Sequence, residues 1–251
     1  MIRIFLIEIE NLTLIYIMTI KSNLLNSIKR KCYNLNLRLQ KSNLQFQNFG
    51  NISLRLDLNQ FIIKPSGVKV TSVHYKDFPV VNIKTKKYTG KLKPSSDMIT
   101  HLELYKKYTK LKSIAHTHSE YGVIWSQACK KIPCLGTTHA DYWLNEILVT
   151  KILLKNEIIK DYQKNIAKSI IETIIKKKIS LDCCPGILVA NHGPFTWGYN
   201  FDDAFLNAER LEYIAKLAYK TLKITKNTNI KKSLIEKHFY RKNGKNSYYG
   251  Q

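Results

Sequence analysis

Residues 113–118 read SIAHTH, a short apolar run that ends in two histidines separated by one residue. Side chains alternate between the two faces of a strand, so His116 and His118 would point to the same face if this run is a strand. Two imidazoles on one face of a rigid strand could supply two of the ligands of a metal site. The stretch therefore predicts a strand that carries a candidate metal site at its end.

A second apolar run, ILVANHGP at 187–194, also ends in a histidine and is then broken by Gly193-Pro194. Two strands that end side by side would bring His116, His118 and His192 together. Three imidazoles that leave a fourth position open are the ligand set of a catalytic zinc site. A single histidine is more often an ordinary hydrogen-bonded residue, so spacing alone leaves both interpretations open.

The rest of the chain predicts one α/β domain. Strands are expected at 52–56, 61–63 and 80–83, with the first two forming a hairpin. Because tight turns and helices both connect the strands, we expect a mixed, mostly antiparallel central sheet covered by α-helices. Residues 137–141 are expected to form a polar loop. Helical spacing predicts helices at 23–42, 98–108, 119–130, 162–178, 202–223 and 229–241.

The bulk composition narrows the class of protein. A chain of 251 residues that is 44% hydrophobic can bury a proper core as a single domain. The net charge of +23 suggests nucleic-acid binding, but only six of the 41 basic residues are arginine, and the lysines are scattered. We therefore expect no nucleic-acid partner. Five cysteines without a Cys-x-x-Cys motif favour a reducing compartment, and so a cytoplasmic protein.

The N-terminal segment MIRIFLIEIENLTLIYI, residues 1–17, is apolar but contains Glu8 and Glu10. It is too short and too charged for a membrane span, and no small-residue cleavage site comes after it. We expect residues 1–17 to be an N-terminal extension or a mis-assigned start, with the domain at 18–251 and no membrane association.

Two serine-rich turns could bind phosphate. Ser66-Gly67 follows Lys64, and Ser95-Ser96 precedes a predicted helix, so both offer hydroxyl and backbone N–H groups. From composition alone, ordinary turn and cap chemistry is the favoured explanation of the same residues. Asp141 presents a similar choice, because a loop carboxylate near a metal could be a general base or merely a solvated side chain.

These features occur together in one known family. The chain from about residue 25 to Gln251 resembles the L-ribulose-5-phosphate 4-epimerases of the class II aldolase/epimerase superfamily. Any one matching segment would be weak, but seven in the right order are highly specific. The segments are FGNIS (49–53), IKPSG (63–67), KPSSD (93–97), AHTHSEYGVIWSQA (115–128), GTTHADY (136–142), NHGPFTWG (191–198) and KHFYRKNGKNSYYGQ (237–251).

The resemblance implies a three-layer α/β/α fold and a role for each matching residue. The metal ligands would be His116, His118 and His192, with Asp97 beside the metal. The acid/base pair would be Asp141 and Tyr249. Residues matching the substrate-binding positions are Asn51, Lys64, Ser66, Gly67, Ser95, Ser96, His238 and Arg241.

The resemblance also implies the chemistry and the assembly. The C4 proton of the phosphorylated ketopentose is not adjacent to the C2 ketone, so inversion at C4 would proceed by retro-aldol cleavage of the C3–C4 bond. One Zn²⁺ per subunit, or alternatively Mn²⁺, would stabilise the enediolate as a Lewis acid. Glycolaldehyde phosphate would rotate and add back to give D-xylulose 5-phosphate. The family is a homotetramer whose sites lie between subunits, with the C-terminal tyrosine donated by a neighbour.

Three alternatives remain at this stage. A zinc-dependent aldolase of the same superfamily, similar to L-fuculose-1-phosphate aldolase, would share the histidines and phosphate turns but release its fragments. A basic, non-catalytic nucleic-acid-binding protein would need its charge organised in a patch. A decayed enzyme would keep the fold without turnover. Asp141 and the YYGQ end at 248–251 favour the epimerase, whereas the segment 143–165 matches the family poorly.

Overall fold

The computed structural model describes residues 2–243, 247 and 248. Its first two strands, β1 (Asn51–Arg55) and β2 (Gln60–Ile63), form the predicted antiparallel hairpin. All residues of β1 and β2 except Gln60 are buried. The remaining strands are β3 (Val80–Asn82), β4 (Tyr88–Thr89), β5 (Ser113–His116), β6 (Gly186–Val189) and β7 (Gly193–Gly198).

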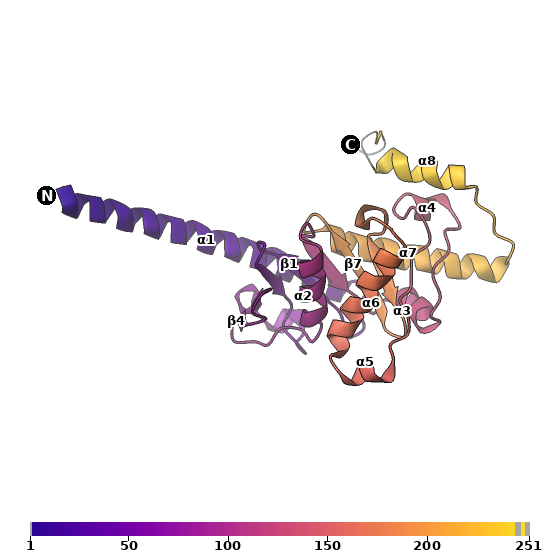
Figure 1. Ribbon diagram of the computed structural model, residues 1–251, viewed down its shortest axis with the longest axis horizontal. Helices are drawn as coiled ribbons and strands as arrows, with labels where there is room; N and C mark the ends of the chain where they lie inside the picture. The colour runs from indigo at the N-terminus through magenta and orange to yellow at the C-terminus, as the bar shows by residue number, and fades with distance from the viewer. Residues whose placement is uncertain (1, 244–246, 249–251) are drawn as a thin grey trace.

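These strands form one seven-stranded sheet in the order β4-β3-β2-β1-β5-β7-β6, and each neighbouring pair within it is antiparallel. This confirms the expected mostly antiparallel sheet. Helices lie on both sides of it (Figure 1). They are α1 (Ile2–Lys41), α2 (Met98–Lys107), α3 (Glu120–Gln127), α4 (Thr137–Ala140), α5 (Lys155–Ile159), α6 (Tyr162–Lys176), α7 (Asp203–Ile224) and α8 (Lys232–Lys242). Short 3₁₀ turns occur at Val70–Ser72, Tyr75–Asp77 and Leu181–Cys183.

Alternation of side chains along the strands creates one hydrophobic cluster on each face of the sheet. Phe61 and Ile63 of β2 face one cluster, which includes residues of α2 and α6, and Ile62 faces the other, which includes residues of α1 and α7. In β5 the same alternation sends Ile114 to the first cluster and Ala115 to the second. A third cluster lies between α3 and α7. The result is the predicted three-layer arrangement.

Helix α1 is longer than the sequence predicts. The expected helix at 23–42 is instead continuous from Ile2 to Lys41, so the proposed boundary at Met18 lies inside it. Its later part packs on the sheet through Ile28, Cys32 and Leu35, whereas its first part extends away from the body (Figure 1). The mostly apolar sequence of residues 2–17 lacks helical periodicity of polar residues, so helical spacing did not predict a helix there.

Three other expectations were wrong. The strand expected at 113–118 ends at His116, so His118 follows the strand instead of sharing its face. Residues 137–140 form the short helix α4 and not a loop. Gly193-Pro194 does not stop strand formation but begins β7, which local sequence patterns did not predict. Proline is tolerated near the beginning of the strand, where its carbonyl accepts a hydrogen bond from the Thr117 N–H at 3.2 Å.

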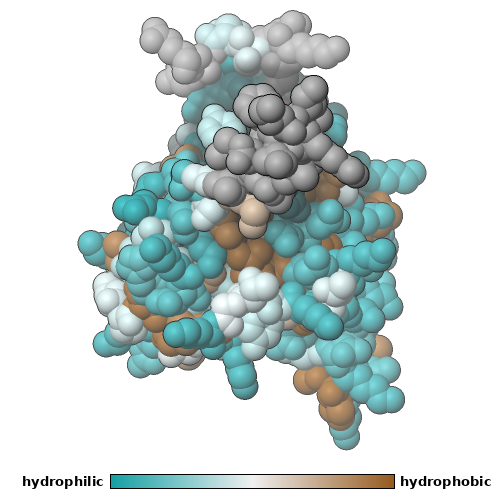
Figure 2. Space-filling model, turned by 90° about the vertical axis from the view of Figure 1, so that its left-hand side faces the viewer, coloured by the Kyte–Doolittle hydropathy of each residue, from teal (hydrophilic) through white to brown (hydrophobic). Residues whose placement is uncertain are grey.

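The face of the molecule drawn in Figure 2 is mostly hydrophilic, with small groups of apolar side chains near its centre and at its lower end. In and just before α5, Ile152, Leu154, Ile158 and Ile159 are all more than half exposed. Among the described residues, no helix combines the length and hydrophobicity of a membrane span. All five cysteines are free thiols.

The packing of α1 can be tested with a matched pair of leucine-to-alanine substitutions. Leu35→Ala removes a side chain that is 1% exposed between α1 and the sheet, and should lower the free energy of unfolding by about 2–5 kcal/mol. Leu24→Ala, on the same helix but 57% exposed, should cost less than about 0.5 kcal/mol. Urea denaturation followed by circular dichroism measures both, and equal costs would contradict this packing.

Candidate metal centre and active site

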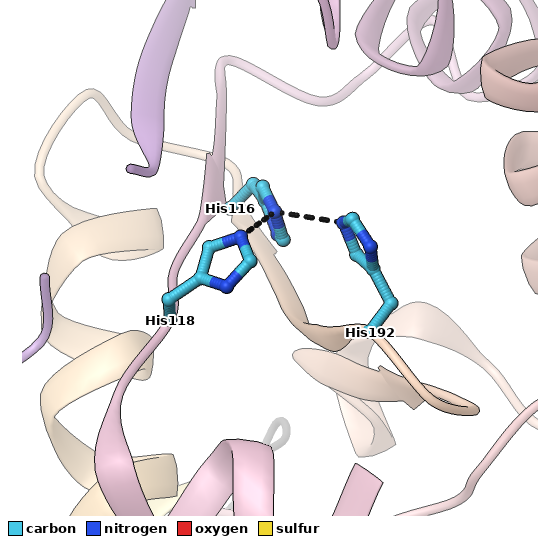
Figure 3. A group of neighbouring side chains, drawn as sticks. All are labelled: His116, His118 and His192. Carbon is cyan, nitrogen blue, oxygen red and sulfur yellow. Dashed lines mark hydrogen bonds between the residues drawn. The ribbon is translucent and has the colours of Figure 1, made fainter. Parts of the chain in front are cut away.

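Three histidines meet where β5 ends and where the β6–β7 turn leads into β7. His116 is the last residue of β5, and His192 lies in the turn just before β7. Pairing of β5 with β7 places His116 opposite Phe195, three residues beyond His192. His118 approaches from the segment after β5, and Figure 3 shows the three rings turned toward one another.

The spacing of the three rings suits a single metal ion. The His116 Nε2 atom lies 3.0 Å from the Nε2 atoms of both His118 and His192. Two nitrogens bound to one tetrahedral zinc at about 2.0–2.1 Å would lie about 3.3 Å apart. One ligand atom from each residue lies within 4.8 Å of the other two. The donor set therefore fits a divalent cation such as zinc with one coordination position open.

Hydrogen bonding behind the His116 ring fixes its tautomer. Its Nδ1 lies 3.0 Å from the Pro194 carbonyl, which can only accept, so Nδ1 carries the hydrogen and Nε2 a lone pair. That single lone pair faces two other imidazole nitrogens and cannot accept well from both. A cation between the rings would satisfy all three. Stacking on Phe195, at 4.3 Å between ring centroids, holds the same ring in place.

Burial keeps the three imidazoles neutral. It lowers the pKa of His116 well below the ordinary value, and the neighbouring His192 and His118 lower it further. Burial also lowers the pKa of His118 and of His192, although the negative charge of Asp97 opposes the shift in both. Neutral imidazole is the form that binds metal, so the rings are ready to act as ligands at neutral pH.

The histidines line a cavity of about 470 Å³ that also contains the serine-rich turns. The structure thus brings together the predicted metal ligands and the predicted phosphate-binding residues. Gly67 has a φ of +69°, which favours glycine in this turn. The lining includes Phe49, Gly50, Asn51, Lys64, Ser66, Gly67, Ser95, Ser96, Asp97, His116, His118 and His192.

Lys64 supplies positive charge to this cavity although it is almost fully buried. Its Nζ donates to the Asn48 carbonyl at 3.0 Å. Burial lowers the pKa of Lys64, and the nearby Asp97 carboxylate opposes that shift. A partly desolvated ammonium beside serine hydroxyls is a strong attraction for an anionic group.

Asp97 is tied to the centre through Asn51. The Asn51 amide nitrogen donates to the Asp97 carboxylate at 2.7 Å and to the Ser95 hydroxyl at 3.0 Å. Asn51 lies opposite His116 in the β1–β5 register. Gly50 makes that approach possible, because a Cβ there would lie 2.8 Å from the His116 carbonyl oxygen. Asp97 therefore lies near the three histidines without belonging to the group of ligand atoms that they form.

Asp141 lies at a different place, where α4 meets α8. Its carboxylate accepts hydrogen bonds from His238 at 3.0 Å and from Arg241 at 3.0–3.2 Å, and forms an ion pair with Lys242 at 3.4 Å. None of these four residues is among those that line the histidine cavity. The predicted acid/base residue and its two C-terminal neighbours are therefore brought together with one another but not with the metal ligands. Tyr249 lies outside the described residues.

A model of the Class II Aldolase and Adducin N-terminal domain family matches residues 30–219. The chain belongs to this family. Among solved structures, an L-fuculose 1-phosphate aldolase is 21% identical with a TM-score of 0.70, and the match covers 84% of this chain and 94% of the aldolase. An L-fuculose 1-phosphate aldolase from Glaciozyma antarctica PI12 is 17% identical with a TM-score of 0.68, over 88% and 84% of the two chains.

YgbL from Escherichia coli, a candidate aldolase/epimerase/decarboxylase, is 19% identical with a TM-score of 0.67, over 85% of this chain and 98% of YgbL. At these identities the structural likeness establishes the fold of this class II aldolase family member and nothing finer. The finer assignment has to come from the residues of the site itself.

Sequence reasoning missed two residues at the centre. Tyr162 reaches the ring of His192 from the start of α6, in a segment whose sequence matches the family poorly. Pro194 looks like a mere strand breaker in the sequence, whereas its carbonyl orients His116. Neither contact can be inferred from local spacing, because each joins parts of the chain whose proximity only the fold creates.

The metal centre can be tested without a substrate. His118→Ala should lose most of its bound zinc, because two remaining imidazoles form an incomplete site. Zinc content of protein made without a histidine tag, measured by mass spectrometry after dialysis, gives the result. His74→Ala removes an exposed histidine that caps a 3₁₀ turn and should retain the metal. Equal zinc content in the two variants would contradict the site.

The contact between Asp141 and α8 predicts a pH dependence. Burial alone would raise the pKa of Asp141, but hydrogen bonds from His238 and Arg241 and the charge of Lys242 lower it below the ordinary 3.8. A depressed carboxyl pKa contributes stability above the unfolded value, and that stability is lost as the pH falls through the folded value.

Asp141→Asn should therefore lower the free energy of unfolding by about 1–3 kcal/mol at neutral pH. The difference from the natural protein should stay constant down to about pH 5 and shrink below pH 4. Urea denaturation across this range provides the measurement, with the exposed Asp57→Asn as the control. A difference that grows on acidification would show that the carboxylate does not stabilise α8.

Proposed function

We propose that this protein is a metal-dependent L-ribulose-5-phosphate 4-epimerase that interconverts L-ribulose 5-phosphate and D-xylulose 5-phosphate. The observation that carries the proposal is the shared cavity, in which three converging histidines lie beside two serine turns and a buried lysine. Such a cavity can hold a sugar phosphate by its phosphate at one end and by its oxygen atoms at the other. Membership of the class II aldolase family supports carbon–carbon bond chemistry on such a substrate.

The substrate itself requires bond cleavage. Its C4 proton is not adjacent to the C2 ketone, so removal of that proton would leave a charge with no place to delocalise. Cleavage of C3–C4 instead leaves the charge beside the ketone. A divalent cation held by His116, His118 and His192 would supply Lewis-acid stabilisation of that charge.

The chain's own residues would then hold the phosphate fragment while its aldehyde turns. Ser66, Ser95 and the backbone of Gly67 would donate to the phosphate, and Lys64 would neutralise part of its charge. Asn51 would keep Asp97 turned toward the centre. Retention of the fragment through its phosphate allows the aldehyde to present its opposite face before the bond forms again.

Proton transfer at the C4 hydroxyl would fall to Asp141 and Tyr249. In the described structure Asp141 is ionised and held by α8, away from the residues that line the cavity. We therefore propose a homo-oligomer, a tetramer by resemblance, in which the region around Asp141 of one subunit completes the cavity of another. The catalytic role requires Asp141 to release part of its contact with α8 when it accepts a proton.

A second candidate is a metal-dependent sugar-phosphate aldolase, because L-fuculose 1-phosphate aldolases are among the structural neighbours. The two activities share the cleavage step and differ in the fate of the fragments. An epimerase adds the fragments back, whereas an aldolase releases them. Asp141 and the YYGQ end at 248–251 support the epimerase. In either case we propose a cytoplasmic enzyme of carbohydrate metabolism, in arabinose catabolism or a similar route to pentose phosphates.

Purified protein with its zinc content measured should convert L-ribulose 5-phosphate to D-xylulose 5-phosphate, detected by a coupled transketolase assay. Dihydroxyacetone and glycolaldehyde phosphate should not accumulate in stoichiometric amounts. His118→Ala should abolish turnover, and His74→Ala should not. Release of dihydroxyacetone phosphate from L-fuculose 1-phosphate, without epimerisation of the pentose, would support the aldolase instead. Full activity in demetallated protein would refute the Lewis-acid role.

A further inference from the structure

Tyr162 lies behind one of the candidate metal ligands. Its hydroxyl oxygen is 3.2 Å from Nδ1 of His192, the nitrogen on the far side of the ring from the other histidines. The two rings are 6.1 Å apart between centroids and inclined by 73°. The phenol thus meets the imidazole at its edge, where a ring N–H can donate.

The local backbone holds Tyr162 in a fixed position. It is the first residue of α6, and the preceding Asp161 adopts a left-handed conformation with φ +55° that turns the chain into the helix. The Asn165 side-chain amide donates to the Glu157 and Lys160 carbonyls at 2.8 and 2.7 Å. These two hydrogen bonds hold the connection between α5 and α6 in place. The Tyr162 ring packs on the hydrophobic cluster that contains Phe61 and Ile63 and residues of α2 and α6. Its hydroxyl is therefore presented by a rigid element.

The two other candidate ligands are supported differently. His116 donates to a main-chain carbonyl, that of Pro194, which no side-chain substitution removes. The ring of His118 contacts Phe49, with centroids 5.5 Å apart. His192 sits in a turn and depends on a side-chain hydroxyl for the hydrogen bond at its outer nitrogen. Its orientation is therefore the one that a single conservative substitution can change.

We propose that Tyr162 is a positioning residue for the metal centre, which accepts the Nδ1 hydrogen of His192 and so directs the Nε2 lone pair at the cation. The inference rests on the proposed metal site. A ligand imidazole whose second nitrogen donates to an oxygen is fixed in tautomer and in ring orientation, and loss of such a partner typically weakens metal binding about 10–100-fold.

Tyr162→Phe tests the proposal because it removes only the hydroxyl. The natural protein and the variant are demetallated, and zinc affinity is measured by competition with a chromophoric chelator. We expect the variant to bind zinc about 10–100-fold more weakly, with a changed visible absorption spectrum of the Co²⁺-loaded protein. Saturating zinc should restore most of the epimerase activity.

Tyr108→Phe is the matched control. Tyr108 packs on the same hydrophobic cluster as Tyr162, and its buried hydroxyl has no hydrogen-bond partner within the described part of the chain. It should keep the zinc affinity of the natural protein. Thermal unfolding of the metal-free proteins shows whether either substitution harms the fold.

The possible outcomes distinguish the metal site from the positioning role. Failure of the natural protein to bind zinc would overturn both together. Tight binding by the natural protein with an equal affinity in Tyr162→Phe would overturn the positioning role alone. Normal affinity with activity that saturating zinc does not restore would also overturn it, because the hydroxyl would then act on the substrate itself.

Discussion

The antiparallel pairing of β5 with β7 is the constraint on which the candidate site depends. It sets His116 opposite Phe195 and brings the β6–β7 turn, with His192, to the end of β5. The Pro194 carbonyl accepts hydrogen bonds from both the Thr117 backbone N–H and the His116 ring N–H. The same residue of β7 therefore contacts the chain after β5 and orients a candidate metal ligand. Three imidazole nitrogens then face one another in a partly buried place, an arrangement that a cation would stabilise and that neutral rings alone satisfy poorly.

Charge is distributed so that the cavity contains both signs. Asp97 opposes the loss of protons from Lys64 and from two of the histidines, and Asn51 fixes its carboxylate. Lys64 adds a poorly solvated ammonium to the same cavity, which serine hydroxyls also line. A cavity with these features suits a ligand that has a metal-binding end and a phosphate end. The high overall positive charge of +23 would help to attract such an anion.

Asp141 lies in a cluster of ion pairs and hydrogen bonds outside the histidine cavity. Its carboxylate contacts His238, Arg241 and Lys242 of α8. Because these contacts lower the pKa of Asp141, the carboxylate is a stable anion and a weak base. A group held in this way orders the C-terminal helix on the body of the protein. A part for Asp141 in catalysis would require these surroundings to change, as they would in the proposed oligomer.

The amino-acid sequence was enough to predict the fold class, the β1–β2 hairpin and most of the helices, because hydrophobic alternation and helical spacing are local properties. Together with motif order it also named every cavity residue from Asn51 to His192 that the proposed function uses. The folded structure was needed to show that His118 follows its strand, that Gly193-Pro194 opens β7, that Tyr162 contacts His192, and that Asp141 pairs with α8. Each of these depends on contacts between segments far apart in the chain, which local patterns of residues do not encode.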